Sequence, residues 1–315
     1  MGNSVIYRSL MASFLFFLGL ISIYFTAPML HAEDSKLKFE WPIKDLELAP
    51  LITSTFGESR KDHFHNGLDI SSVFQPVHSM ADGSVLYSRY REDDPFEDER
   101  GSGNIVWLAH DSGYISGYYH LAGSRHENIR TKSKVAAGEV IGISGNTGHS
   151  SGGHLHFVLG KDYGKTLLDP LSHLPKIEDT MPPQIANLFI HVGEKFTNLN
   201  DGDNINVSKA FPLTMSIFDG GVKNSQRRGI RDIEFQFNGE NIKKTNFMSI
   251  HYEKGKWLTE NGLSFEDLYY KDRYLVGILN LKAGENTIKV KSKDFSGQES
   301  ERSFSINITR ISGEN

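Results

Sequence analysis

The sequence predicts an all-β protein made of two domains. Its 315 residues include 30 glycines, 20 phenylalanines and 12 tyrosines, a composition that favours strands and turns over helices. Short apolar or aromatic runs alternate with turn-forming residues, and long amphipathic stretches are few. A chain of this length can form two domains of ordinary size, each with its own core.

The amino terminus has the pattern of an export signal. Arg8 precedes an apolar run over residues 10–26, and residues 30–32 offer a small-residue cleavage site. We therefore assign residues 1–32 to a signal peptide. Because the run is about as long as the shortest membrane-spanning helices, an uncleaved N-terminal membrane anchor is the alternative. Both forms predict an exported protein, periplasmic or associated with the cell envelope.

Composition excludes several classes of protein. The chain contains no cysteine, which rules out a disulfide framework, a lipidated cysteine anchor and a cysteine nucleophile. The formal net charge of -5 leaves no basic footprint, so nucleic acid is not an expected partner.

Residues 33–178 are predicted to form a compact, mostly antiparallel β-sheet domain. Turn-forming residues at positions 81–83, 111–113 and 137–138 separate short apolar runs. The candidate strands are 84–90, 104–109, 114–120, 139–144 and 154–159.

One segment of this domain breaks the pattern. Residues 89–100 carry six carboxylates and three arginines, followed by Gly101 and Gly103. The segment is too polar to be buried, so we expect either a solvated surface loop or a loop that borders a cleft and selects substrates.

Residues 179–184 are predicted to be a linker, because the consecutive prolines Pro182 and Pro183 can continue neither a helix nor a central strand. Short strand-like runs separated by turn signals then fill residues 185–315, a pattern typical of an immunoglobulin-like β-sandwich. These runs are 185–192, 211–218, 230–237, 274–281, 286–293 and 303–309.

The histidines indicate a metal site in the first domain. Ten of the thirteen lie between His63 and His173. In an extended strand, His154 and His156 project from the same face. Neutral imidazoles and a carboxylate are ligands that zinc prefers, and three protein ligands are usual in catalytic zinc sites. His65, Asp69 and one or both of the strand histidines supply such a set.

Several sequence blocks resemble the lysostaphin-type (LytM) zinc endopeptidases, which cut peptide cross-bridges or stems in bacterial cell walls with a compact antiparallel sheet domain. The resemblance extends over roughly residues 40–174. The blocks are 56–60 (FGESR), 65–69 (HNGLD), 81–85 (ADGSV), 103–107 (GNIVW), 118–121 (YYHL), 138–142 (GEVIG) and 144–157 (SGNTGHSSGGHLHF).

The resemblance implies a role for each of five residues. The zinc ligands of the family fall on His65, Asp69 and His156, and its two catalytic histidines fall on His120 and His154. Residues 281–297 bear a looser resemblance to the closing hairpin of bacterial immunoglobulin-like modules.

Three neighbouring positions carry further expectations. The family commonly has an acidic residue where this chain has Val158, and its loss could weaken support of a histidine. Strand alternation places Tyr118 on the face of His120, where core packing is the more ordinary role. Arg60 could pair with a carboxylate of the substrate or of the protein.

Together these features predict an exported zinc endopeptidase that hydrolyses peptide bonds of peptidoglycan stems or cross-bridges. The metal would polarise the scissile carbonyl, and His120 and His154 would handle the water and its protons. One alternative is a catalytically silent cell-wall-binding protein or hydrolase activator of the same fold. Another is a peptidase that acts on secreted protein.

Overall fold

The computed structural model of the chain describes residues 37–44, 46–96, 101–222 and 226–311. The predicted signal segment, residues 1–32, lies outside these ranges, as do residues 97–100 of the acidic segment. Among the described residues, every helix is too short or too polar to cross a membrane.

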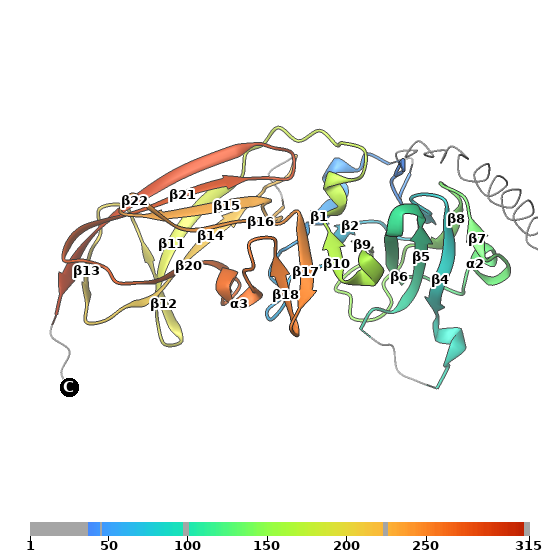
Figure 1. The fold of residues 1–315 in the computed structure, drawn as a ribbon, viewed down its shortest axis with the longest axis horizontal. Helices are drawn as coiled ribbons and strands as arrows, with labels where there is room; N and C mark the ends of the chain where they lie inside the picture. Colours follow the sequence, from blue (N-terminus) through green and yellow to red (C-terminus); the bar gives the residue numbers. More distant parts are fainter. Residues whose placement is uncertain (1–36, 45, 97–100, 223–225, 312–315) are drawn as a thin grey trace, which may run out of the picture. The chain divides into compact units, whose positions relative to one another are not determined.

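The prediction of an all-β protein is confirmed (Figure 1). The described residues of the first part of the chain form ten strands, one short helix and several 3-10 turns. They include β1 (Ile52–Ser54), β2 (Leu68–Ile70), β3 (Pro76–His78), β4 (Gly83–Arg89), β5 (Asn104–His110), β6 (Ile115–Leu121), α2 (Glu127–Thr131), β7 (Lys134–Val135), β8 (Val140–Ile143), β9 (Leu155–Lys161), β10 (Thr166–Leu168) and the 3-10 turn η5 (Pro170–Ser172).

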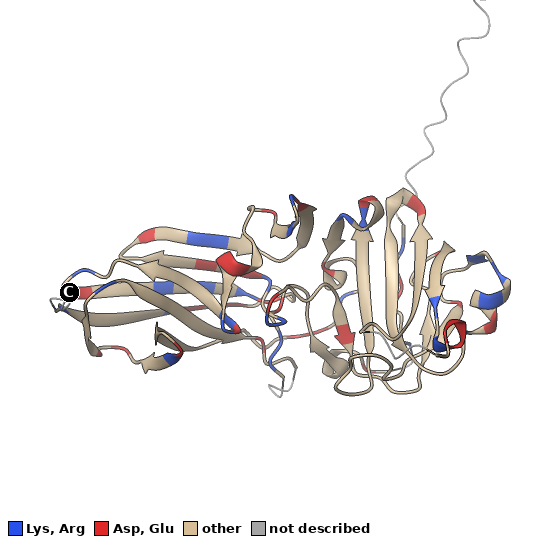
Figure 2. Ribbon diagram, turned by 90° about the horizontal axis from the view of Figure 1, so that it is seen from below, with Lys and Arg blue, Asp and Glu red and all other residues tan. Residues whose placement is uncertain are grey.

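A large antiparallel sheet dominates this part of the molecule. Its strands follow the order β18 (Lys256–Thr259), β17 (Ser249–Glu253), β10, β9, β6, β5, β4 and β7, and β2 attaches β1 to β9. The central strands β5 and β6 contain no Lys, Arg, Asp or Glu and are drawn without charge colour in Figure 2. Their side chains are largely buried on both faces, so the chain here consists of apolar, aromatic and small residues.

The C-terminal half, residues 184–311, forms two five-stranded sheets with the orders β12-β11-β14-β20-β19 and β13-β22-β21-β15-β16. Both sheets contribute side chains to one apolar cluster, as in a two-layer β structure. The immunoglobulin-like character of this half stays a prediction. Its elements are β11 (Gln184–Val192), β12 (Lys195–Leu199), β13 (Asn204–Val207), β14 (Phe211–Phe218), β15 (Asp232–Phe237), β16 (Glu240–Asn246), β17 (Ser249–Glu253), β18 (Lys256–Thr259), α3 (Phe265–Leu268), β19 (Tyr269–Tyr270), β20 (Arg273–Leu279), β21 (Gly284–Lys293) and β22 (Glu299–Arg310).

The two halves of the chain are connected by strand pairing and by a shared apolar cluster. Strand β17 pairs with β10, so that β17 and β18 extend the first sheet with residues from the C-terminal half. The apolar cluster of the C-terminal half also includes Phe56, Phe64, Val158 and Leu167. The first half therefore buries some of its apolar side chains against the C-terminal half.

The segment between the halves is anchored at its first residue. Asp179 is buried, and its carboxylate pairs with the buried guanidinium of Arg228, which also pairs with Asp219. Residues 179–184 contain no strand before β11 begins at Gln184, as two prolines require.

Candidate metal and catalytic site

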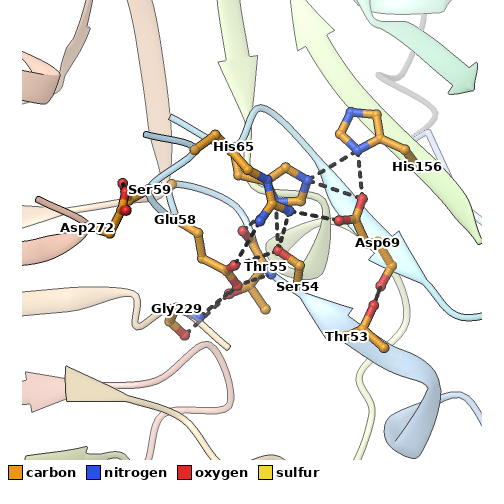
Figure 3. Close-up of polar contacts among 12 residues, drawn as sticks. Thr53, Ser54, Thr55, Glu58, Ser59, His65, Asp69, His156, Gly229 and Asp272 are labelled. Atoms are coloured by element: carbon orange, nitrogen blue, oxygen red, sulfur yellow. Dashed lines mark hydrogen bonds and ion pairs between the residues drawn. The ribbon is translucent and has the colours of Figure 1, made fainter. Parts of the chain in front are cut away.

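The three predicted metal ligands come together at one end of the first sheet. Strand β2 pairs with β9 so that Asp69 lies opposite His156, and His65 precedes β2. The Oδ1 atom of Asp69 is 2.7 Å from Nδ1 of His156 and 3.2 Å from Nε2 of His65. Nε2 of His65 and Nδ1 of His156 are 3.1 Å apart. Figure 3 shows both rings turned toward the carboxylate of Asp69. All three ligand atoms lie within 4.8 Å of one another.

The hydrogen bonds on the far side of each ring indicate which nitrogen carries a lone pair. Nδ1 of His65 lies 2.7 Å from the carbonyl oxygen of Thr55, so it donates and leaves Nε2 unprotonated. Nε2 of His156 lies 3.0 Å from Oδ1 of Asn66, which leaves Nδ1 unprotonated in the same way. Two nitrogen lone pairs and a carboxylate oxygen facing one another repel unless a cation lies among them. This donor set fits zinc.

The electrostatics of the ligands agree with metal binding. Burial opposes the charged form of Asp69, but the adjoining imidazoles of His65 and His156 outweigh it and hold the pKa of this carboxyl well below its usual value. Burial lowers the pKa of His156 to about 4. An ionised carboxylate and a neutral imidazole are the forms that bind a metal.

The sequence did not identify the partner of Arg60. In the structure, Arg60 pairs with the carboxylate of the metal ligand Asp69. Its Nη2 atom donates to Oδ2 of Asp69 at 2.8 Å and to Oγ of Ser54 at 2.6 Å. The carboxylate is therefore held at one oxygen by a guanidinium and presents the other oxygen to the two imidazoles. This contact orients the ligand and supports its charge.

The two predicted catalytic histidines line the same hollow. The rings of His120 and His154 are 4.8 Å apart between centroids, and Nε2 of His154 is 3.7 Å from Oδ1 of Asp69. Nδ1 of His120 lies 2.7 Å from the carbonyl oxygen of Thr147, and Nδ1 of His154 lies 2.8 Å from that of Gly152. Each ring thus donates through Nδ1 and has a lone pair at Nε2. Burial lowers the pKa of His120, which favours its neutral form.

Tyr118 has the core-packing role expected of it, but the expectation that it shares a face with His120 is wrong. Tyr118 is fully buried and hydrogen-bonds the backbone of Met80, so it packs in the core. Tyr119 instead lines the hollow, with its ring 5.3 Å from that of His156. Strand alternation fails here because His120 has a positive φ of 60°, which turns its side chain toward the same hollow as Tyr119. No signal in the sequence marks this reversal.

The hollow around these residues measures about 560 Å³ and lies next to an apolar groove. Both are lined by Asn66 and Tyr119, and the groove is also lined by Trp257 of β18. Val158 lies in this groove, only 7% exposed and part of the apolar cluster shared with the C-terminal half. A carboxylate at this position would be buried among apolar groups, which gives a physical reason for the departure from the family pattern.

The described part of the acidic segment is attached to the domain surface. Glu92 pairs with Arg125 and Arg130, and Asp93 pairs with Arg125. Residues 89–96 do not line the hollow, whereas Gly101 and Ser102, which follow the segment, do. Its effect on substrate choice stays a prediction.

A family model described as peptidase family M23 matches residues 63–170, a range that includes all five site residues. Residues 63–170 form a peptidase family M23 domain. A second family model matches residues 182–309, a range that does not overlap the M23 match.

Relatives of the M23 domain include both enzymes and activators. The chain is 35% identical over 96 residues to a peptidoglycan DD-endopeptidase, ShyA, of Vibrio cholerae, covering 30% of this chain and 20% of that protein. It is 33% identical over 126 residues to the murein hydrolase activator NlpD of Escherichia coli, covering 40% of this chain and 29% of that protein. The matches thus span less than a third of the length of these relatives.

Among solved structures, the chain is similar to a zinc-containing peptidase from Vibrio cholerae. The identity is 28%, the TM-score is 0.34, and the match covers 42% of this chain and 39% of that one.

Proposed function

We propose that this protein is an exported, zinc-dependent endopeptidase that hydrolyses peptide bonds of bacterial peptidoglycan, the substrate class named for relatives of its M23 domain. His65, Asp69 and His156 would bind the zinc ion. The observation that supports this most directly is the convergence of their three lone-pair atoms in the hollow that His120 and His154 also line.

The metal site and the two histidines that are not ligands would have different chemical roles in the reaction. His65, Asp69 and His156 would hold a zinc ion that, when bound, would supply a Lewis acid for the scissile carbonyl. His120 and His154 are fixed through Nδ1, so each offers Nε2 to accept a proton from the attacking water or to return one to the leaving amine. The apolar groove beside Tyr119 would hold the peptide on one side of the cut.

The second candidate is a protein that activates a separate cell-wall hydrolase, as the similarity to NlpD suggests. Retention of all five ligand and catalytic positions favours the enzyme, because a silent activator has no need of them.

Digestion of purified peptidoglycan by the full chain, with mass analysis of the released fragments, tests the proposal. We expect fragments from cleaved stem or cross-bridge peptides, and none with Asp69→Ala, which should also lose zinc because two imidazoles alone bind it poorly. A zinc-loaded protein that releases no fragments, yet stimulates a separate peptidoglycan hydrolase, would contradict the enzyme and support the activator. Digestion of glycine-rich proteins in parallel separates a cell-wall enzyme from a general peptidase.

A further inference from the structure

The loop that precedes the metal ligands, residues 54–60, is held by residues of the C-terminal half. The backbone N–H of Gly229 donates to Oε1 of Glu58 at 2.8 Å, and Oη of Tyr269 donates to the carbonyl oxygen of Gly57 at 2.8 Å. Oγ of Ser59 donates to Oδ1 of Asp272 at 3.0 Å. Figure 3 shows Gly229 and Asp272 beside this loop.

Glu58 combines one contact to the C-terminal half with several contacts inside the loop. Its side chain is 14% exposed, and besides Gly229 it accepts hydrogen bonds from the backbone N–H of Thr55 at 2.5 Å and the hydroxyl of Thr55 at 3.1 Å. Its second oxygen accepts from the hydroxyl of Ser54 at 2.5 Å. One carboxylate thus joins two consecutive loop residues to the backbone of the C-terminal half.

Those two loop residues contact the groups that orient the metal ligands. The carbonyl oxygen of Thr55 accepts from Nδ1 of His65, which fixes the ring so that Nε2 faces the site. The hydroxyl of Ser54 accepts from Arg60, whose guanidinium holds Asp69. Gly229 is therefore connected through Glu58 to two of the three ligands, to Asp69 by hydrogen bonds through Ser54 and Arg60 and to His65 through the backbone of Thr55.

We propose that Glu58 is a positioning residue through which the C-terminal half fixes His65 and Asp69 in the geometry that binds zinc. The inference rests on the proposed zinc site and assigns the C-terminal half a part in it. Gly229 is suited to this contact because it lacks a side chain: a Cβ atom there would lie 2.6 Å from Cγ of Glu58 and 3.1 Å from Oγ1 of Thr55. A substitution in the C-terminal half should therefore disturb the metal site.

The test measures zinc affinity of the full chain by competition with a chromophoric chelator, together with the visible spectrum of the cobalt-substituted protein. We expect Glu58→Gln and Gly229→Ala each to weaken zinc binding by about 10–100-fold, the usual effect of losing a group that orients a ligand. The cobalt bands, which report ligand geometry, should shift in both variants. Ser59→Ala is the matched control. It removes a neighbouring contact between the same segments outside the path to His65, and its zinc affinity should be unchanged.

A double mutant tests whether Gly229 acts through Glu58. If the new methyl group displaces the Glu58 side chain, Glu58→Ala together with Gly229→Ala should bind zinc as Glu58→Ala does alone. If the two substitutions instead lowered zinc affinity additively, this would contradict an effect of Gly229 through Glu58.

The outcomes separate failure of this inference from failure of the proposed function. A wild-type chain that binds no zinc would overturn both. Wild-type zinc affinity in Glu58→Gln and Gly229→Ala would overturn the positioning role and leave the metal site standing. So would equal losses in Ser59→Ala, or a zinc-free Glu58→Gln protein whose thermal unfolding shows general collapse of the fold.

Discussion

At the scale of single residues, His120 carries backbone strain at the centre of the site. A positive φ at a residue other than glycine costs about 1–2 kcal/mol, because Cβ crowds the following carbonyl oxygen. The surrounding strand pairs and the bond to Thr147 hold the residue in this conformation. Strain of this kind is typical of functional positions.

This strain predicts different stabilities for two truncations of the same side chain. His120→Gly and His120→Ala both remove the imidazole, but only glycine adopts the positive φ without crowding. We expect the glycine variant to be more stable than the alanine variant by about 1 kcal/mol. Chemical denaturation of both proteins measures the difference, and an alanine variant of equal or greater stability would show that the backbone relaxes when the ring is removed.

The division of labour among the histidines predicts separate effects on metal and activity. His120→Ala and His154→Ala should keep zinc and lose about 10²–10⁴-fold in peptidoglycan cleavage, because each removes a proton-transfer group and no ligand. Metal analysis and fragment release, measured on the same preparations, check this. If either variant were purified without zinc, the substituted histidine would be a metal ligand and this prediction would be wrong.

At the scale of elements, η5 begins with a buried acidic cap. Asp169 accepts hydrogen bonds from the backbone N–H groups of Leu171 and Ser172 and from the Ser172 hydroxyl. Burial raises the pKa of Asp169 to about 6. Because this carboxyl group is fully enclosed, the folded protein loses stability when the group ionises.

The raised pKa predicts the direction of a pH effect. Between the unfolded value of 3.8 and the folded value of about 6, the folded chain binds the proton more tightly. The contribution of Asp169 to the free energy of unfolding is therefore present below about pH 4 and is lost as the pH rises through 6. It amounts to on the order of 3 kcal/mol.

Asp169→Asn should remove this dependence, because asparagine caps a helix equally well without a charge. Unfolding free energies of both proteins at pH 4.5, 5.5, 6.5 and 7.5, in chelator to eliminate metal binding, measure the effect. We expect Asp169→Asn to become more stable relative to the parent protein as the pH rises. A constant difference would show that Asp169 titrates near its ordinary value.

At the scale of the whole molecule, the two halves of the chain depend on one another. Phe56, Phe64 and Leu167 are buried in a cluster made mostly by the C-terminal half, and β10 pairs with β17. Burial of a large apolar side chain stabilises a fold by about 1.5–3 kcal/mol. The proposed boundary at residues 179–184 thus separates two units of sequence whose cores are in contact.

A chain that ends at Lys176 should therefore fold poorly. It would expose these apolar side chains and leave the edge of β10 unpaired, a combination that promotes aggregation. Soluble yield, size-exclusion chromatography and thermal unfolding, compared with the full chain, measure the effect. A monomeric truncated protein with the melting temperature of the parent would show that the M23 domain is independent.

Local patterns in the sequence determined the fold class and much of the site. Strands with strongly apolar runs, such as β5, β9 and β14, were predicted within a residue or two, because turn chemistry and side-chain alternation act between neighbours in the chain. Strands β12 and β16 were missed because they are largely exposed and polar. The convergence of His65, Asp69 and His156 was foreseen from ligand chemistry and a family resemblance.

The support and the boundaries of the site depend on contacts between segments that are far apart in the sequence. The pairing of Arg60 with Asp69, the contact of Glu58 with Gly229 and the addition of β17 and β18 to the first sheet join residues from separate segments of the chain. The positive φ of His120 likewise depends on the strands that enclose it. Local sequence patterns contain no record of such contacts, because their free energy arises when distant segments pack together.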